Sequence, residues 1–295
     1  MTVHDTRERA AQAPHTTGIN PPGFPVPPGA CDCHMHIFDT SLPFAPGPVL
    51  KHADASVDDY RLLQSRLRLE RNVIVQPSSY GRDHRVLLRS LRASKGLAKG
   101  IAVIDPSATP EELEVLRAHG VVGVRFNLVQ AGATDESMLE QVARLVQPLG
   151  WHIQLHLAPA DLRRLADRLM ALPVPIVLDH FARLHVDASQ ADEVEATVSR
   201  MLRSTRVWLK LSAPYIASPR SSAYEDLDGF VRRLAASHLD RLLWGTDWPH
   251  VTEADKPDDA VLMNLLPRWL GEDEIRQVLV RNPEALYGFQ SLQET

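Results

Sequence analysis

Two histidines separated by one residue, His34 and His36, lie in the apolar segment 31–37. A glycine before the segment and a proline after it leave a run too short for a helix, so we predict a β-strand. Side chains alternate across a strand, so we expect Asp32, His34 and His36 on one face and the two cysteines on the other. Two imidazoles on one face can bind a zinc or similar ion, although two ordinary histidines at a strand end give the same pattern.

Later apolar runs carry further residues of metal-binding types near their ends. His156 lies near the end of the run 152–157, and His180 follows the run 174–178. Asp247 comes shortly after another apolar run. Imidazole and carboxylate groups are common zinc ligands. Each residue also has a structural interpretation when taken alone, since His156 could be an ordinary hydrogen-bonded core histidine.

The elements that must position these residues form an alternation of strands and helices. Short apolar runs predict strands over residues 31–37, 72–76, 100–104, 121–126, 152–157, 174–178, 207–211 and 241–244. Amphipathic segments predict helices over residues 56–70, 83–94, 109–119, 135–149, 159–172, 189–204, 222–237, 256–270 and 272–280. Apolar strands separated by helices are typical of parallel sheets covered on both faces. Eight such units favour an α/β fold of the (β/α)8 TIM-barrel type, and the lack of a Gly-x-Gly-x-x-Gly turn disfavours a dinucleotide-binding sheet.

The domain organisation follows from the position of the predicted elements. Residues 1–29 are polar and then rich in proline, so we predict a mobile arm that is ordered at most near its end. Residues 30–289 are predicted as a single barrel domain, because no repeat or internal linker interrupts them. Residues 290–295 are predicted as a tail.

Polar residues recur at one end of the predicted strands. A TIM barrel places its site at the C-terminal ends of the strands, and ionisable groups are costly to bury without partners. The residues at or just beyond those ends are His34, His36, Gln76, Ser78, Arg125, Asn127, His156, His180, Arg183, Asp247 and His250. This recurrence favours a functional barrel mouth that holds the ligands of one divalent ion. The two cysteines are expected to face away from it, which disfavours a Cys/His zinc site.

Some of these polar residues also have a structural explanation. The guanidinium of Arg125 is suited to bidentate binding of a carboxylate, but it could equally form a structural salt bridge. Asp179 alternates away from His180 and could cap the following helix. His250 could form a hydrogen bond within its loop instead of contacting a substrate.

The pattern of polar residues resembles that of the amidohydrolase superfamily, and in particular its lactonase branch. That branch includes 2-pyrone-4,6-dicarboxylate lactonase and sulfomuconolactone hydrolase. The resemblance extends from residue 29 to about residue 289. Its most specific segments are GACDCHMH at 29–36, GVRFN at 123–127, LDH at 178–180 and LWGTDWPH at 243–250.

The resemblance implies a role for each matching residue. Metal-binding members hold one ion with residues that match His34, His36, His156 and Asp247. The histidine that matches His180 orients or polarises the reacting groups, and the matching aspartate transfers the proton, so Asp247 and His180 are the expected catalytic residues. The expected substrate-binding residues are Gln76, Ser78, Arg125, Arg183, Asn127 and His250.

Two departures from the pyrone-dicarboxylate lactonase bear on the substrate. That enzyme works without a metal and has a tyrosine where this chain has His156, so the histidine restores a full ligand set. It also uses further arginines after the Arg-Phe-Asn segment and after the seventh strand. Here those regions are 128–131 and 212–215, LVQA and SAPY. We therefore expect a lactone smaller or differently charged than a pyrone dicarboxylate.

The sequence thus predicts a metal-dependent hydrolase that opens a carboxylate-bearing lactone, of the muconolactone or sugar-acid type, with metal-activated water. One divalent ion, with zinc as the first expectation, is the expected cofactor. A decarboxylase or a lactone isomerase of the same superfamily is the alternative. A non-enzymatic barrel is disfavoured because no expected ligand is missing.

Composition limits the partners and the location. A net charge of −5 gives no reason to expect nucleic acid or an anionic membrane surface as a partner. Apolar runs fall short of the roughly 20 residues that span a bilayer, and the first residues lack the apolar core of a signal peptide. Two cysteines one residue apart do not form a disulfide framework, so we expect a reducing, cytoplasmic setting. A homo-oligomer remains possible.

Overall fold

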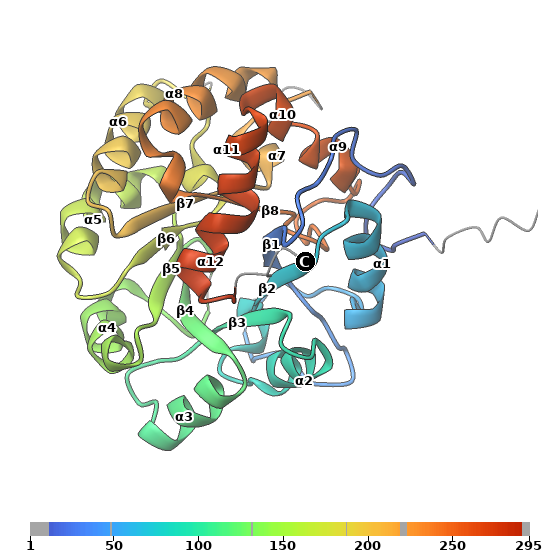
Figure 1. Cartoon of the computed structure of the whole chain (residues 1–295). Helices are drawn as coiled ribbons and strands as arrows, with labels where there is room; N and C mark the ends of the chain where they lie inside the picture. Colours follow the sequence, from blue (N-terminus) through green and yellow to red (C-terminus); the bar gives the residue numbers. More distant parts are fainter. Residues whose placement is uncertain (1–11, 48, 131, 187, 219–222, 291–295) are drawn as a thin grey trace, which may run out of the picture.

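Eight parallel strands form a barrel that helices surround (Figure 1). The computed structural model describes residues 12–47, 49–130, 132–186, 188–218 and 223–290. The strands are β1 Cys31–Met35, β2 Arg71–Val75, β3 Ala98–Ala102, β4 Val121–Asn127, β5 His152–His156, β6 Ile176–Leu178, β7 Val207–Ser212 and β8 Leu242–Gly245. Each pairs in parallel with the next strand in the chain. The predicted TIM barrel is confirmed.

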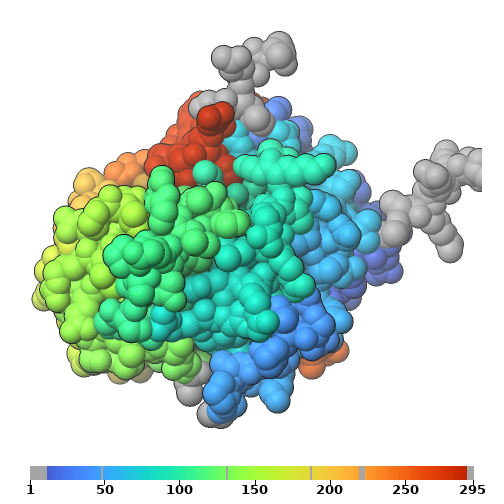
Figure 2. Space-filling view, turned by 90° about the horizontal axis from the view of Figure 1, so that it is seen from below, coloured from blue at the N-terminus to red at the C-terminus, as the bar shows by residue number. Residues whose placement is uncertain are grey.

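Helices follow the strands around the outside of the barrel. They are α1 Val57–Leu67, α2 Arg85–Ala93, α3 Pro110–Ala118, α4 Leu139–Val146, α5 Pro159–Ala171, α6 Ala191–Leu202, α7 Pro214–Ala217 and α8 Asp228–His238. After β8 come α9 Asp259–Met263, α10 Leu266–Trp269, α11 Glu272–Arg276 and α12 Asn282–Tyr287. In Figure 2, α2 and α3, coloured teal and green, form much of the face turned to the reader. No helix in the described part of the chain is long and apolar enough to cross a membrane.

Local sequence explains where several elements begin. The side chain of Ser56 accepts a hydrogen bond from the backbone of Asp59, whose carboxylate bonds back to Ser56, so α1 starts with a capping box. Thr109 and Glu112 form the same arrangement at α3. Strand β6 is shorter than predicted, because Pro175 has no N–H group to donate to a neighbouring strand. The short helix α7 was not predicted.

The barrel closes where β1 meets the segment after β8. The backbone N–H of Asp247 donates to the carbonyl of His34 at 2.8 Å, and that of His36 donates to the carbonyl of Trp248 at 2.8 Å. These bonds continue the parallel ladder beyond the regular strand β8. Closure therefore brings the first histidine pair of the chain directly beside Asp247.

The lower end of the barrel interior is an apolar cluster, here called the lower cluster. Its buried members are Cys31, Cys33, Val73, Val75, Ile101, Val177, Trp208, Leu243, Tyr287 and Phe289. They come from six strands and from the C-terminal segment, and side chains of strands on opposite sides of a barrel meet only in its interior. Tyr287 at the end of α12 and Phe289 just after it contribute aromatic side chains to this end of the core.

The predicted face assignment of β1 is wrong for its lower half. The cysteines lie in the barrel interior, and Asp32 instead faces α1, where it accepts a hydrogen bond from the hydroxyl of Tyr60 at 2.9 Å. The pairing register of β1 with β2 shifts between Asp32 and Met35. Such an irregularity interrupts the strict alternation on which the prediction rested.

The described part of the N-terminal segment packs on the barrel. Ala13 and Thr16 are buried, and the indole N–H of Trp248 donates to the carbonyl of Pro14 at 2.9 Å. The guanidinium of Arg66 in α1 donates to the carbonyl of Thr17 at 2.9 Å. Residues 13–17 thus contact α1 and the segment after β8. Residues 1–11 lie outside the described residues, and the mobile arm expected for residues 1–29 stays a prediction.

Candidate active site

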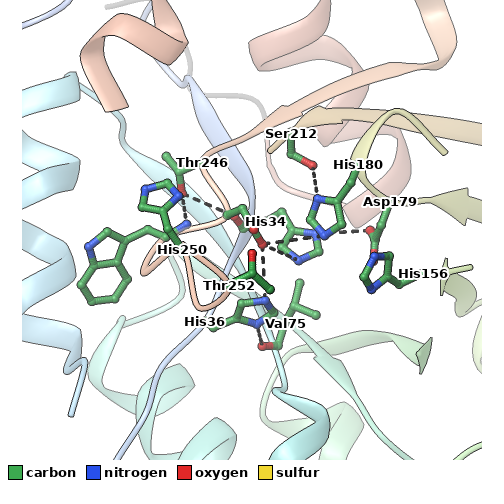
Figure 3. A network of polar contacts seen from close by, with 12 residues as sticks. His34, His36, Val75, His156, Asp179, His180, Ser212, Thr246, His250 and Thr252 are labelled. Atoms are coloured by element: carbon green, nitrogen blue, oxygen red, sulfur yellow. Dashed lines mark hydrogen bonds and ion pairs between the residues drawn. The ribbon is translucent and has the colours of Figure 1, made fainter. Parts of the chain in front are cut away.

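Three imidazoles converge on one carboxylate oxygen at the C-terminal end of the barrel. The Nε2 atoms of His34, His36 and His180 lie 3.5, 3.6 and 3.7 Å from Oδ1 of Asp247. The ring centroids of His34 and His36 are 5.0 Å apart, and those of His34 and His180 are 4.5 Å apart. Figure 3 shows the three histidines gathered in one network. We call these four residues the upper site.

Backbone conformation at the strand ends aims these side chains. His180 to Arg183 all have φ between 52° and 54°, and Asp247 has φ 65°. Each non-glycine residue in this left-handed region costs roughly 1–2 kcal/mol. The surrounding structure holds the segments in place, since His180, Phe181 and Asp247 are all buried. Strain of this kind concentrates at functional sites.

Neighbouring groups determine which ring nitrogen each histidine presents. His36 Nδ1 lies 2.7 Å from the carbonyl oxygen of Val75, which can only accept, so Nδ1 carries the hydrogen and Nε2 keeps its lone pair. His34 Nδ1 lies 3.2 Å from Oδ1 of Asp179 and 3.3 Å from Nζ of Lys210. A hydrogen on Nδ1 that points to the carboxylate leaves Nε2 of His34 with its lone pair, as in His36. Carboxylates and carbonyls behind metal-binding histidines do this in many metal sites.

A cluster of buried polar side chains lies beneath the upper site, and most of it was not predicted from the sequence. Lys210 is fully buried, and its Nζ donates to Oε1 of Gln154 at 2.6 Å and lies 3.5 Å from Oδ1 of Asp179. Gln154 donates to Oδ2 of Asp179 at 3.1 Å. Asp179 therefore neutralises the lysine and orients His34 instead of capping a helix. The lone lysine in the apolar run 207–211 was the available signal.

Burial sets the protonation states of these groups. It lowers the pKa of His34 and His156 well below the ordinary value, and it also lowers the pKa of His180. Neutral imidazoles are the form that binds a metal. For Asp247, burial opposes ionisation, but the nearby His180 and His36 outweigh it and hold the pKa of this carboxyl well below its usual range. These directions favour neutral imidazoles at His34, His156 and His180 and an ionised carboxylate at Asp247.

His156 lies apart from the group of His34, His36 and Asp247, whose donor atoms are all within 4.8 Å of one another. Its Nε2 is 3.1 Å from a guanidinium nitrogen of Arg183, and its ring centroid is 5.0 Å from that of His180. The predicted four-residue ligand set is therefore not gathered into one cluster. Arg183 occupies Nε2 of His156, whereas Nδ1 of the same ring is buried and has no hydrogen-bond partner among the described residues.

A cleft opens above the upper site, with about 610 Å³ of atom-free space when its open mouth is included. Arg125, Arg183, Ser78 and Asn127 line it, together with apolar side chains. The amide of Asn127 donates to the hydroxyl of Ser78 at 3.1 Å. Arg125 is buried, with Nε 3.7 Å from Oδ2 of Asp179, so it combines a structural ion pair with a place in the cleft.

Two predicted substrate-binding residues do not line this cleft. The side chain of Gln76 donates to the carbonyl of Gly81 at 2.6 Å and accepts from the backbone of Val103 at 3.3 Å, so it ties loops together. His250 is fully buried behind Asp247, with Nδ1 3.1 Å from the hydroxyl of Tyr215. Gln76 directly follows β2 and His250 lies in the loop after β8, and neither position in the sequence indicates which way the side chain turns.

The family is clear from comparison with known proteins. A family model described as amidohydrolase matches residues 31–289, which is most of the chain. The chain belongs to the amidohydrolase family. The predicted resemblance is thereby confirmed, and this amidohydrolase presents its polar residues at the same end of the barrel that the fold predicts for catalysis.

Curated relatives of this amidohydrolase act on lactones. The 2-pyrone-4,6-dicarboxylate hydrolase of Comamonas testosteroni is 36% identical over 90% of this chain and 92% of its own length. The 4-sulfomuconolactone hydrolase of Hydrogenophaga intermedia is 33% identical, covering 92% of each chain. The D-galactarolactone isomerase of Agrobacterium fabrum is 31% identical, covering 93% of this chain and 95% of its own. A crystal structure from Agrobacterium tumefaciens superposes with a TM-score of 0.84 at 28% identity, covering 94% and 99% of the two chains.

Proposed function

We propose that this amidohydrolase is a metal-dependent hydrolase that opens a carboxylate-bearing lactone of the muconolactone or sugar-acid type. The observation that carries the proposal is the convergence of three imidazole Nε2 atoms on Asp247 beneath a cleft that contains two arginines. The size of the cleft suits a small molecule. The names of the relatives support a lactone as the substrate class.

The donor set fits one divalent ion, for which we propose zinc. Nε2 of His34 is buried and has no hydrogen-bond partner among the described residues, and His36 directs a bare Nε2 to the same place. These two histidines and Asp247 would hold the ion, and His156, whose buried Nδ1 has no hydrogen-bond partner within the described ranges, would be the fourth ligand. When bound, such an ion supplies Lewis acidity, which polarises a carbonyl and brings the pKa of water toward neutral.

Two side chains of the upper site have different roles in the reaction: Asp247 transfers the proton and His180 stabilises the oxyanion. Asp247 accepts a proton from the attacking water as the new bond to the carbonyl carbon forms, and it returns that proton to the ring oxygen as the acyl C–O bond breaks. His180 is bonded to the hydroxyl of Ser212 through Nδ1 at 2.9 Å, so its Nε2–H can stabilise the developing oxyanion. The product is a hydroxy acid, which releases one proton near neutral pH.

The arginines of the cleft hold the carboxylate of the substrate. Arg125 and Arg183 present guanidinium groups, which match a carboxylate in charge and geometry. Ser78 and Asn127 add a hydroxyl and an amide on the same side of the cleft. A bound carboxylate would also draw Arg183 away from His156, which would free the imidazole.

The test combines metal analysis with a panel of lactones. The purified enzyme is assayed before metal removal, after removal with a chelator, and after addition of zinc, with muconolactones and sugar-acid lactones scored by proton release. We expect activity on carboxylate-bearing rings, a loss of at least about 100-fold on removal of the metal, and recovery with zinc. Full activity of the metal-free enzyme would overturn the metal dependence, and inactivity on the whole panel would overturn the substrate class.

Isomerisation of a lactone is the alternative, because one relative is named for it. Migration of the acyl group between two hydroxyls of a substrate consumes no water and releases no net proton. A change in ring size followed by NMR, without acid production, would therefore favour the isomerase over the hydrolase.

A further inference from the structure

The two carboxylate oxygens of Asp247 have different surroundings. Oδ1 faces the imidazoles of the upper site. Oδ2 faces away from them and accepts a hydrogen bond from the hydroxyl of Tyr215 at 2.8 Å. A carboxylate that rotated about its last torsion would exchange the two oxygens, and this hydrogen bond opposes that rotation.

Tyr215 is in turn held by a buried pair. Its hydroxyl lies 3.1 Å from Nδ1 of His250, and Nε2 of His250 lies 3.1 Å from Oδ2 of Asp259. Both His250 and Asp259 are fully buried. The phenol has a single hydrogen, so when it donates that hydrogen to Asp247, Nδ1 of His250 must be the donor in its contact with the phenol oxygen. Asp259 accepts at Nε2, so this arrangement places a hydrogen on both ring nitrogens and makes His250 an imidazolium paired with the Asp259 carboxylate.

The fold places Tyr215 behind the cleft and not in it. Ala213 has φ 51° and Pro214 starts the short helix α7, so the chain turns sharply after β7. The next residue, Ile216, lines the cleft, whereas Tyr215 points at Asp247 and His250. A phenol in this place reaches the reaction only through Asp247.

We propose that Tyr215, held by His250 and Asp259, is a positioning residue that keeps Oδ1 of Asp247 turned toward the ligands and the substrate. This inference rests on the proposed function. Burial and the neighbouring Asp247 raise the pKa of Tyr215 well above its ordinary value, so the phenol keeps its hydrogen. Groups that orient metal ligands in this way typically contribute about 10–100-fold to metal affinity or activity.

The test compares Tyr215→Phe with Tyr287→Phe. The Tyr287 side chain is buried in the lower cluster, and its hydroxyl has no hydrogen-bond partner within the described ranges, so it is a matched control for loss of a buried hydroxyl. We expect Tyr215→Phe to lower kcat about 10–100-fold with KM changed by less than about threefold, and to speed zinc release to a chelator by about tenfold. Tyr287→Phe should retain the wild-type kcat, KM and rate of zinc release.

A double variant tests whether the buried pair acts through Tyr215. Asp259→Asn should lower kcat on its own, and Asp259→Asn combined with Tyr215→Phe should be no slower than Tyr215→Phe alone. Losses that multiply, or a Tyr215→Phe enzyme equal to wild type in kcat and zinc release, would overturn the proposal. If wild type binds zinc but hydrolyses no lactone, the proposed function fails, and the zinc-release comparison still decides the role of Tyr215.

Discussion

The two ends of the barrel interior are built from the same strands but follow opposite rules. The lower cluster is apolar, and its side chains meet in the interior with the aromatic residues of the C-terminal segment. The upper site instead collects three imidazoles and a carboxylate, and two of these residues, His180 and Asp247, have positive φ. Burial of apolar area at the lower end stabilises the fold. The free energy gained there offsets the cost of the strained backbone and the buried polar groups at the upper end.

The layer between them shows how a charge is tolerated inside a barrel. Lys210, Asp179 and Gln154 bond to one another there, and Asp179 also orients His34. Burial lowers the pKa of Lys210, while the carboxylate of Asp179 works in the opposite direction. A buried pair of this kind is destabilising if one partner is lost. The layer therefore couples the stable end of the barrel to the functional end.

The largest expected effect is a loss of activity at the upper site that leaves the stability of the fold nearly unchanged. Asp247→Asn should lower kcat by about 10³-fold or more, because the amide cannot take the proton in the transition state. Its free energy of unfolding in the metal-free state should stay within about 1 kcal/mol of wild type, since the amide oxygen can still accept from Tyr215. Steady-state kinetics measures the expected loss of kcat, and urea unfolding measures the free energy of unfolding. A variant with more than a tenth of wild-type kcat would remove Asp247 from the proposed mechanism.

The pH dependence of stability tests the role of His152, whose ring centroid at the lower end is 5.5 Å from that of Tyr287. Burial lowers the pKa of His152 from 6.5 to about 3. Between these values the unfolded chain binds a proton that the folded chain does not, so stability is full above pH 6.5 and falls as the pH is lowered. Relative to His152→Met, metal-free wild type should lose roughly 2 kcal/mol between pH 6.5 and pH 4.5. Parallel stability curves for the two proteins would show that His152 does not cause the loss.

A truncation in the lower cluster should affect stability alone. Ile101→Ala leaves a cavity in the fully buried core, and the expected cost is about 3 kcal/mol in the free energy of unfolding. Activity per folded molecule should be unchanged at low temperature. Leu97→Ala, at a side chain that is 52% exposed just before the same strand, is the control and should cost little. A large fall in kcat/KM of folded Ile101→Ala would mean that the two ends are more tightly coupled than we infer.

The smallest expected effect lies in the cleft. Arg125→Lys keeps a positive charge but loses the planar fork that binds both oxygens of a carboxylate. We expect KM to rise about tenfold, or about 1.4 kcal/mol, with kcat nearly unchanged. Arg200→Lys, at a surface ion pair with Asp167, is the control. If KM rises equally for lactones with and without a carboxylate, Arg125 does not bind that carboxylate.

Much of the architecture could be predicted from the chain, because the signals were local and repeated. Apolar runs and amphipathic segments indicated all eight strands and most of the helices. The helices predicted over 256–270 and 272–280 are broken into shorter helices in the structure. Helix α7 was not predicted, because a four-residue helix that begins at a proline shows too little periodicity.

Chain order and residue type alone determined that His34, His36, His180 and Asp247 meet at one end of the barrel, since parallel strands bring their C-terminal ends together. Side-chain direction was decided only by the tertiary structure. The register shift in β1 turned the cysteines inward, Arg183 engaged His156, and the sharp turn at Ala213 aimed Tyr215 at Asp247. Each of these depends on contacts between residues far apart in the chain, which local pattern does not encode.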